Sequence, residues 1–167
     1  MDFILYEYIT MGAGVLPIAI YDGKIYFLFS REAINAKKDG GLWSDFGGGK
    51  EKLENYKQTA IRECYEEANG ILGTKKKISK LVKHTIDSIT LDGYKTHIVV
   101  IRYDKSLVKK FRNAFLDIKK NKPELVAKNG LYEKDMLRWV SFGDLKKNMK
   151  IFRPFYRKFI KYILDNM

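Results

Sequence analysis

The sequence contains little cysteine, little histidine and no long apolar run. Its single cysteine, Cys64, cannot form a disulfide within the chain, so we expect a reducing intracellular compartment, the cytoplasm. The two histidines, His84 and His97, lie inside strand-like runs and lack the spacing of a zinc site. No stretch approaches the roughly 20 apolar residues of a membrane span, and residues 1–4 lack the basic segment of a secretory signal. We therefore expect neither a disulfide scaffold nor a membrane partner.

Acidic residues are also scarce compared with basic ones. The chain has 20 Asp and Glu against 32 Lys and Arg, which gives a formal net charge of +12. The basic residues are concentrated in residues 75–83, 105–122 and 146–161. Basic surfaces attract polyanions and accelerate their capture. A phosphate-rich substrate or RNA would match such a surface, and a lysine-rich genome is the alternative explanation.

Length and composition indicate a globular protein. Of the 167 residues, 46% are hydrophobic and 14% aromatic, which is unlike a disordered chain. This length suits one domain with a sizeable core. We find no internal repeat, low-complexity tract or linker, so the expectation is a single domain over residues 1–167.

Residues 41–71 combine a glycine-rich loop with a helix that has an acidic face. Asn55 is the predicted N-cap and Gln58 its capping-box partner, so the helix should begin near Tyr56. At about 100° per residue, one stripe carries three carboxylates and the opposite side packs on a core. The carboxylates are Glu63, Glu66 and Glu67, and the packed side has Ala60, Ile61, Cys64, Tyr65 and Ala68.

The acidic stripe needs compensation, because carboxylates three and four residues apart destabilise a helix by roughly a few tenths of a kcal/mol per pair. Lys57 and Arg62 offset part of this repulsion. A divalent cation such as Mg²⁺ fits better, because it takes oxygen ligands and keeps waters and substrate phosphates in its shell. A solvated acidic face on an ordinary amphipathic helix is the alternative.

The same residues resemble the Nudix hydrolase signature, G-x5-E-x7-R-E-U-x-E-E-x-G-U, in which U is apolar. Gly48 is followed by five residues and Glu54, then by seven residues and the run Arg62-Glu63-Cys64-Tyr65-Glu66-Glu67. Asn69 stands where the family has glycine, and Gly70 comes one residue late. Since Asn is the next-best residue for the left-handed conformation of a helix end, this departure concerns the helix exit more than the metal site. Residues 41–49 also resemble Nudix proteins of large DNA viruses.

The resemblance implies an α/β/α sandwich with a mixed β-sheet, and an enzyme that cleaves a pyrophosphate linkage with a metal-activated water. Either Glu66 or Glu67 is the expected general base. Arg62 is expected to orient the carboxylates, and Glu54 to support the loop or act as an outer ligand. The expected ligands of Mg²⁺ or Mn²⁺ are the backbone carbonyl of Gly47 and the side chains of Glu63, Glu66 and Glu67.

The sequence leaves three alternatives for the ligand. One reading is a nucleoside diphosphate derivative: a nucleoside triphosphate, a nucleotide sugar or a dinucleoside polyphosphate. A second is capped mRNA, bound by residues 105–122 and the basic C-terminal helix. A third is a non-catalytic module that binds a nucleotide or RNA, although every signature carboxylate is present. The candidate substrate-binding residues are Phe29, Arg31, Trp43 and Glu133, with Trp139 as a further candidate; Trp43 is equally a core residue. The resemblance also implies an acid from a later loop that contacts metal or activates water, for which Glu133 and Asp135 are the candidates, although a plain surface acid is the simpler interpretation of either.

Hydrophobic patterning predicts the remaining elements. Residues 11–21 form a continuous apolar run, typical of a strand with both faces covered, and Asp22-Gly23 predicts a hairpin to residues 24–30. A second hairpin is expected around Asp92-Gly93, between the β-rich runs 78–91 and 94–103, after a basic connector at 72–77. We also expect helices at 106–120 and 152–164, strands at 2–9, 42–46 and 137–141, and a helical turn at 142–145.

Overall fold

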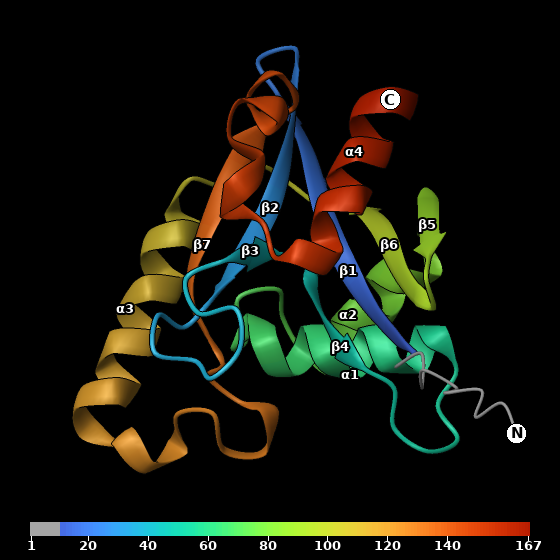
Figure 1. Ribbon diagram of the computed structural model, residues 1–167. Coiled ribbons are helices and arrows are strands. Elements are labelled where there is room, and N and C mark those ends of the chain that lie inside the picture. Colours follow the sequence, from blue (N-terminus) through green and yellow to red (C-terminus); the bar gives the residue numbers. More distant parts are fainter. Residues whose placement is uncertain (1–10) are drawn as a thin grey trace, which may run out of the picture.

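The computed structural model describes residues 11–167 as a mixed β-sheet with helices on both faces (Figure 1). The expected strand at 2–9 lies outside the described residues. The strands are β1 (Gly12–Tyr21), β2 (Lys24–Glu32), β3 (Trp43–Ser44), β4 (Phe46–Gly49), β5 (Asp87–Leu91), β6 (Tyr94–Val100) and β7 (Lys134–Ser141). The helices are α1 (Tyr56–Ala68), α2 (Lys75–Lys83), α3 (Ser106–Asn121) and α4 (Arg157–Asn166), with 3-10 segments η1 (Pro123–Leu125), η2 (Lys128–Gly130), η3 (Phe142–Ile151) and η4 (Pro154–Tyr156).

Strand β1 is the centre of the sheet, whose order is β3-β2-β1-β6-β5. It pairs antiparallel with β2 and β4 and parallel with β6, while β7 pairs with β2. The hairpin predicted at Asp22-Gly23 is confirmed, with φ of 50° and 68°, as is that at Asp92-Gly93, with φ of 47° and 77°. Positive φ at both central residues is the geometry that the Asp-Gly pair favours.

Two hydrophobic cores cover the two faces of the sheet. Ala13 and Val15 of β1 contact the core formed with α1, α2 and α3, whereas Leu16 and Ile18 contact the core formed with α4. Because both faces are covered, β1 is apolar along most of its length. The predicted α/β/α sandwich is therefore correct. Cys64 is buried in the first of these cores, as expected for a structural cysteine.

The segment after α1 differs from its prediction. Residues 75–83 form helix α2, where a connector and the start of a strand were expected, and His84 caps its C-terminus. The Thr74 side chain accepts the Lys77 N–H, which fixes the first turn, while Ile78 and Val82 face the core at helical spacing. His97 does lie in a strand, with Nδ1 3.3 Å from the Gly14 carbonyl oxygen.

Smaller differences concern element boundaries. The glycines predicted as a loop belong to β4, and β7 begins at Lys134, three residues early. The helical turn expected at 142–145 continues to Ile151 as η3, and α4 begins only at Arg157, because Pro154 starts a separate 3-10 turn. Among residues 11–167, no helix combines the length and the apolar character needed to cross a membrane.

Candidate active site

Helix α1 begins and ends as its sequence predicts. The Gln58 N–H donates to Asn55 Oδ1 at 2.9 Å, and the Asn55 N–H donates to Gln58 Oε1 at 2.9 Å. These reciprocal bonds form the capping box. At the other end Asn69 has φ of 50°, the left-handed conformation of a helix exit. The position of the acidic residues on α1 is therefore fixed at both ends.

Arg62 is the centre of the charged cluster on α1. Its Nε donates to Glu54 Oε1 at 2.6 Å, and its Nη2 donates to Glu54 Oε2 at 3.1 Å and to the Gly49 carbonyl at 2.9 Å. Its Nη1 donates to Glu63 Oε1 at 2.9 Å and to Glu66 Oε2 at 3.3 Å. The hydrogen bonds from Arg62 lower the pKa of Glu54 to about 2. One guanidinium thus orients three carboxylates and the end of the glycine strand.

Glu67 does not share the open stripe predicted for the three carboxylates. Its side chain is 2% exposed, compared with 13% for Glu63 and 20% for Glu66. Its Oε2 accepts the Gly47 N–H at 2.9 Å, and its Oε1 lies 3.9 Å from the Lys134 ammonium. The reason is that α1 packs against β4, so the last carboxylate of the stripe faces the glycine strand.

Glycines allow this close packing between β4 and α1. A Cβ on Gly48 would lie 2.6 Å from the carboxyl carbon of Glu63, and one on Gly130 would lie 2.7 Å from Glu66 Oε2. A Cβ on Gly47 would clash with the Tyr94 hydroxyl. The N–H and C=O of a strand residue point to the same side. The Gly47 carbonyl therefore lies on the edge of β4 that faces Glu67.

Burial raises the pKa values of all three carboxylates on α1. Loss of water raises the pKa of Glu63 to about 7, although Arg62 opposes the shift. Burial also raises the pKa of Glu66, and it raises that of Glu67 well above its usual value although Lys134 lowers it. Arg62 and Lys134 therefore neutralise the cluster only in part.

The donor atoms fit a hard divalent cation. Glu63, Glu66, Glu67 and the Gly47 carbonyl offer only oxygen, which is the ligand set of Mg²⁺ and Mn²⁺. Within residues 11–167, no group of three acidic, histidine or cysteine side chains has the arrangement needed to hold a metal ion. Arg62 Nη1, hydrogen-bonded to both Glu63 and Glu66, holds the place of a cation there. The other two oxygens, Glu63 Oε2 and Glu66 Oε1, take no hydrogen bond from Arg62, so an ion would find them available while Arg62 keeps its contacts.

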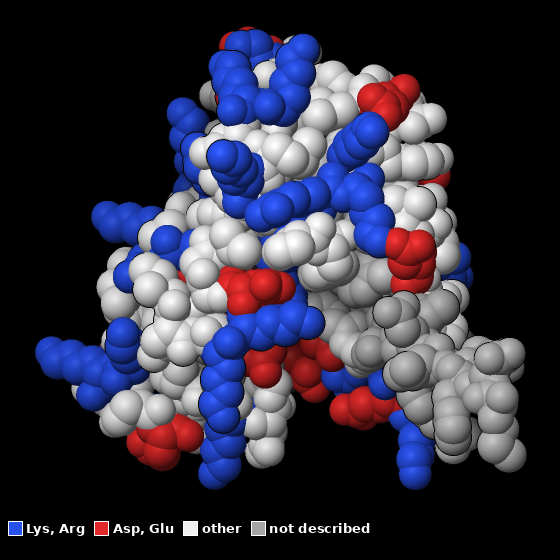
Figure 2. Space-filling view, in the orientation of Figure 1, with Lys and Arg blue, Asp and Glu red and all other residues white. Residues whose placement is uncertain are grey.

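A cavity of about 680 Å³ adjoins the cluster. Figure 2 shows acidic side chains grouped in the lower middle of one face, with lysine and arginine side chains beside and above them. Glu133, a predicted site residue, lines the cavity, and burial raises its pKa. Charged or polar lining residues also include Glu32, Asn35, Lys37, Lys38, Glu63, Glu67, Tyr132 and Arg153.

Sequence reasoning missed a second group of charged residues behind this cavity. The fully buried Lys134 donates to Glu32 Oε1 at 2.6 Å, and Arg153 Nη1 donates to the same oxygen at 2.9 Å. Arg153 Nε donates to Asp39 Oδ2 at 3.0 Å. These residues come from β2, β7 and the loops after β2 and before α4. The available signal was weak: charged residues at the end of β2 and at the start of β7.

Three of the predicted substrate-binding residues do not line the cavity. Phe29 is fully buried, with its ring centroid 4.9 Å from that of Phe152, so the prediction that it contacts substrate is wrong. Alternation along β2 turns it toward the α4 core.

Trp43 is also a core residue, which was the alternative to substrate binding. Arg31 lies over Trp43 and pairs with Asp135 through bonds of 2.8 and 2.9 Å, so both charges are structural here. Trp139, half-buried, donates to the Asp104 carbonyl.

Comparison with known proteins gives matches in sequence and in structure. Residues 10–163 match the NUDIX domain. A stretch of 70 residues is 39% identical to an uncharacterized protein of Acanthamoeba polyphaga mimivirus, and it covers 41% of this chain but only 22% of that protein. The chain thus matches about a fifth of the length of this relative.

Several solved structures share the fold. A Nudix hydrolase from M. smegmatis, RenU, superposes with a TM-score of 0.53 at 16% identity, over 94% of this chain and 85% of that one. A C. elegans Ap4A hydrolase gives 0.54 at 16% identity, over 92% and 94%. The NUDIX domain of Shewanella oneidensis NrtR, solved with ADP ribose, gives 0.52 at 12% identity, over 99% and 92%. At these identities the likeness concerns the fold alone.

Proposed function

This chain belongs to the NUDIX family, a family of hydrolases, and we propose that it cleaves a phosphoanhydride bond in a nucleotide with the help of Mg²⁺ or Mn²⁺. The proposed substrates are nucleoside diphosphate derivatives: nucleoside triphosphates, nucleotide sugars or dinucleoside polyphosphates. Cavities of about 300–1,000 Å³ suit ligands of this size, and this one measures about 680 Å³. Of the proteins that share the fold, one is an Ap4A hydrolase and another, NrtR, is complexed with ADP ribose, and both compounds are of this class. The mimivirus match supports a source among large DNA viruses.

The observation that carries the proposal is the set of carboxylates on α1. Glu63 and Glu67 line a cavity together with Gly47, Gly48 and Gly49, and Arg62 hydrogen-bonds both Glu63 and its neighbour Glu66. When bound, the metal supplies Lewis acidity toward the phosphate oxygens and acidifies a water molecule. The proposed ligands are the Gly47 carbonyl and the side chains of Glu63, Glu66 and Glu67.

Glu66 is the better placed of the two expected bases. Its Oε2 accepts a hydrogen bond from Arg62, which leaves Oε1 to take a proton from the attacking water. Glu67 is buried between the Gly47 N–H and Lys134, so we propose it as a metal ligand and not as the base. The water oxygen attacks phosphorus, the bond from phosphorus to the bridging oxygen breaks, and two phosphorylated products leave.

The test is a substrate panel assayed with Mg²⁺, with Mn²⁺ and with EDTA, using nucleoside triphosphates, nucleotide sugars and dinucleoside polyphosphates. We expect turnover that EDTA abolishes and either metal restores. Glu66→Gln should lower kcat by about 10²–10⁴-fold without changing the fold, whereas Glu124→Gln, an exposed acid away from the cavity, should not. Nucleotide binding without any turnover would instead indicate the non-catalytic module.

A further inference from the structure

Helix α2 has a strongly basic exposed surface. Its sequence, KKKISKLVK, contains no acidic residue, and its five lysines are exposed while Ile78 and Val82 are buried. Within the described residues 11–167, none of these lysines lies within 4.0 Å of a carboxylate oxygen. The charge of α2 therefore has no acidic partner among residues 11–167.

Three of these lysines occupy an unfavourable place. Lys75, Lys76 and Lys77 form the first turn of α2, directly after the cap Thr74. The N-terminus of a helix carries partial positive charge, so each cation there is disfavoured by the helix dipole. No acidic residue in that turn offsets it. An anion bound from outside would relieve both the repulsion among the lysines and their repulsion by the helix end.

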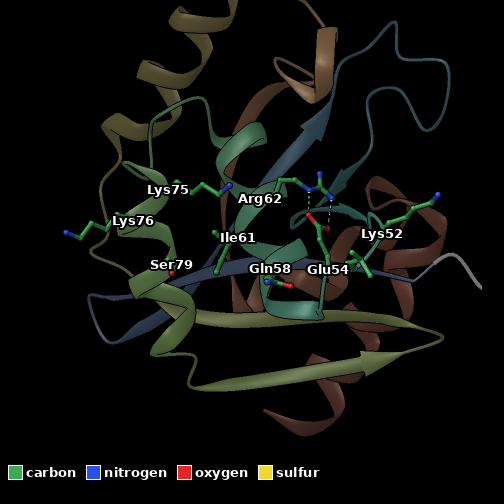
Figure 3. A pocket seen from close by; sticks show the side chains of 9 residues that line it. Lys52, Glu54, Gln58, Ile61, Arg62, Lys75, Lys76 and Ser79 are labelled. Carbon is green, nitrogen blue, oxygen red and sulfur yellow. Dashed lines mark hydrogen bonds and ion pairs between the residues drawn. The ribbon is translucent and has the colours of Figure 1, made fainter.

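A groove lies beside this surface and is lined by two residues of the charged cluster, Glu54 and Arg62. It lies between α2, α1 and the loop before α1, with a volume of about 680 Å³ (Figure 3). In this view Lys75 extends from α2 toward α1, and Lys76, which also lines the groove, extends in the opposite direction. Arg62 lines the groove, and its guanidinium bonds Glu63, which lines the catalytic cavity. The groove and the cavity thus meet at the Arg62–Glu63 pair.

We propose that the α2 surface binds the phosphate backbone of a single-stranded RNA whose 5′ end enters the catalytic cavity. The α2 surface is defined as Lys52, Lys75, Lys76, Lys77, Lys80 and Lys83. The inference rests on the proposed function, because RNA is the nucleic acid that carries a phosphoanhydride at its end, as a 5′-triphosphate or a cap. Helix α2 itself offers no apolar face to a lipid bilayer, since Ile78 and Val82 face the core, and Leu53 is the single exposed large apolar side chain among the residues that line the groove.

This assignment moves the RNA site away from residues 105–122 and the C-terminal helix, the segments that the sequence predicts to bind RNA. In the C-terminal helix, Lys158 already pairs with Asp92. Helix α3 packs against β7 and includes the exposed acid Asp117 among its lysines. Neither helix contributes a residue to the groove at Arg62. The lysines of α3 therefore serve as a control with the same loss of charge.

The experiment compares Lys75→Gln/Lys76→Gln/Lys77→Gln with Lys109→Gln/Lys119→Gln/Lys120→Gln. Binding of a 5′-triphosphate RNA of about 20 nucleotides is measured by fluorescence anisotropy in EDTA over a salt series. For the α2 variant we expect affinity to fall at least about tenfold and the slope of log K against log salt to become shallower by about 2, at 0.7 per lost phosphate contact on a single strand. The α3 variant should bind like the parent, within about twofold.

A kinetic readout complements binding. With capped RNA and the free cap dinucleotide as substrates, the α2 substitutions should lower the ratio of their kcat/KM values, and the α3 substitutions should leave it unchanged. Thermal melts check the fold. The α2 variant should melt no lower than the parent, because it removes cations from the positive end of a helix.

Three results would overturn the assignment: an unchanged salt slope in the α2 variant, an equal loss in the α3 variant, or competition by polyglutamate as strong as that by RNA, which would indicate an acidic protein as the partner. Failure of the proposed function is distinguishable, because binding is measured without catalysis. RNA binding that depends on α2, combined with no hydrolysis of any nucleotide, would support the surface and reject the enzyme.

Discussion

The two charged halves of the candidate site are built differently. The α1 half, Glu54, Arg62, Glu63 and Glu66, comes from one helix and the loop before it, and its side chains are partly exposed. The sheet half, Glu32, Lys134 and Arg153, joins residues 102 and 121 positions apart in sequence, and Lys134 is fully buried. Partly exposed groups can exchange partners, whereas a buried ammonium needs its carboxylate permanently. The α1 half is thus suited to chemistry and the sheet half to support.

The largest expected effect on stability tests the supporting role of the sheet half. Lys134→Met leaves Glu32 and Glu67 without the buried ammonium, and we expect the free energy of unfolding to fall by about 3–5 kcal/mol. Chemical denaturation measures it. Lys147→Met is the control, because Lys147 pairs with Asp144 at the exposed surface, where a pair contributes at most about 1 kcal/mol. Equal losses in the two variants would remove the distinction between the halves.

The second prediction tests the precision of the α1 half. In Gly48→Ala the new methyl group would meet the Glu63 carboxyl carbon at 2.6 Å, so Glu63 must move. A shift of about 1 Å at a catalytic group can cost about 10²-fold in rate, and we expect kcat to fall by that order. Gly143→Ala is the matched control, because its Cβ would meet nothing within 4 Å. Full activity in Gly48→Ala would show that Glu63 need not be held there.

The third prediction concerns pH. Arg62 lowers the pKa of Glu54 to about 2 in the folded protein, from 4.5. A carboxylate with a lowered pKa contributes stability above its unfolded pKa, and this contribution disappears as pH falls through the folded value. The parent should exceed Glu54→Gln by about 1–2 kcal/mol near neutral pH, and the difference should shrink from about pH 4.5 toward pH 2.

Denaturant titrations at several pH values measure this difference. Glu124→Gln is the control and should show no such trend, because Glu124 is exposed and has no ion pair among the described residues. A pH-independent difference for Glu54→Gln would mean that packing, and not charge, links Glu54 to Arg62.

The smallest expected effect lies at the end of α1. Asn69 has positive φ, and its buried side-chain amide has no hydrogen-bond partner in the described structure. Asn69→Gly restores the glycine of the family signature and removes an unsatisfied polar group, so we expect a gain of about 1 kcal/mol with unchanged kcat. Asn69→Ala keeps a Cβ at positive φ and should destabilise. A loss of activity in Asn69→Gly would show that the helix exit matters for catalysis.

The parts of the fold that sequence reasoning predicted correctly are those set by neighbours in the chain. The Asn55–Gln58 box and the two Asp-Gly hairpins depend on two to four residues each, so local patterns suffice. Helix α2 was missed because its lysines hide a two-residue apolar stripe, although Thr74 was a usable cap signal. The contact of Lys134 with Glu32 depends on how β7 pairs with β2, which no local pattern encodes.

The same limit applies to the candidate site. Spacing on α1 placed Glu63 and Glu66 together, but it could not show that Glu67 is buried, because that follows from packing of α1 on β4. Phe29 lies in the core because side chains alternate along β2 and its side of the strand is covered by the core that includes α4. Roles of Glu66, Glu67 and the Gly47 carbonyl as ligands stay predictions.

Arg62 gives the protein a counterion of its own. Its guanidinium hydrogen-bonds one oxygen of Glu63 and one of Glu66, so a divalent ion on these carboxylates would share them with a positive charge that belongs to the chain. Such an ion would bind more weakly than it would to the same carboxylates without Arg62. Arg62 also lines the groove beside α2, so a single side chain contacts both the carboxylates and the surface proposed for RNA.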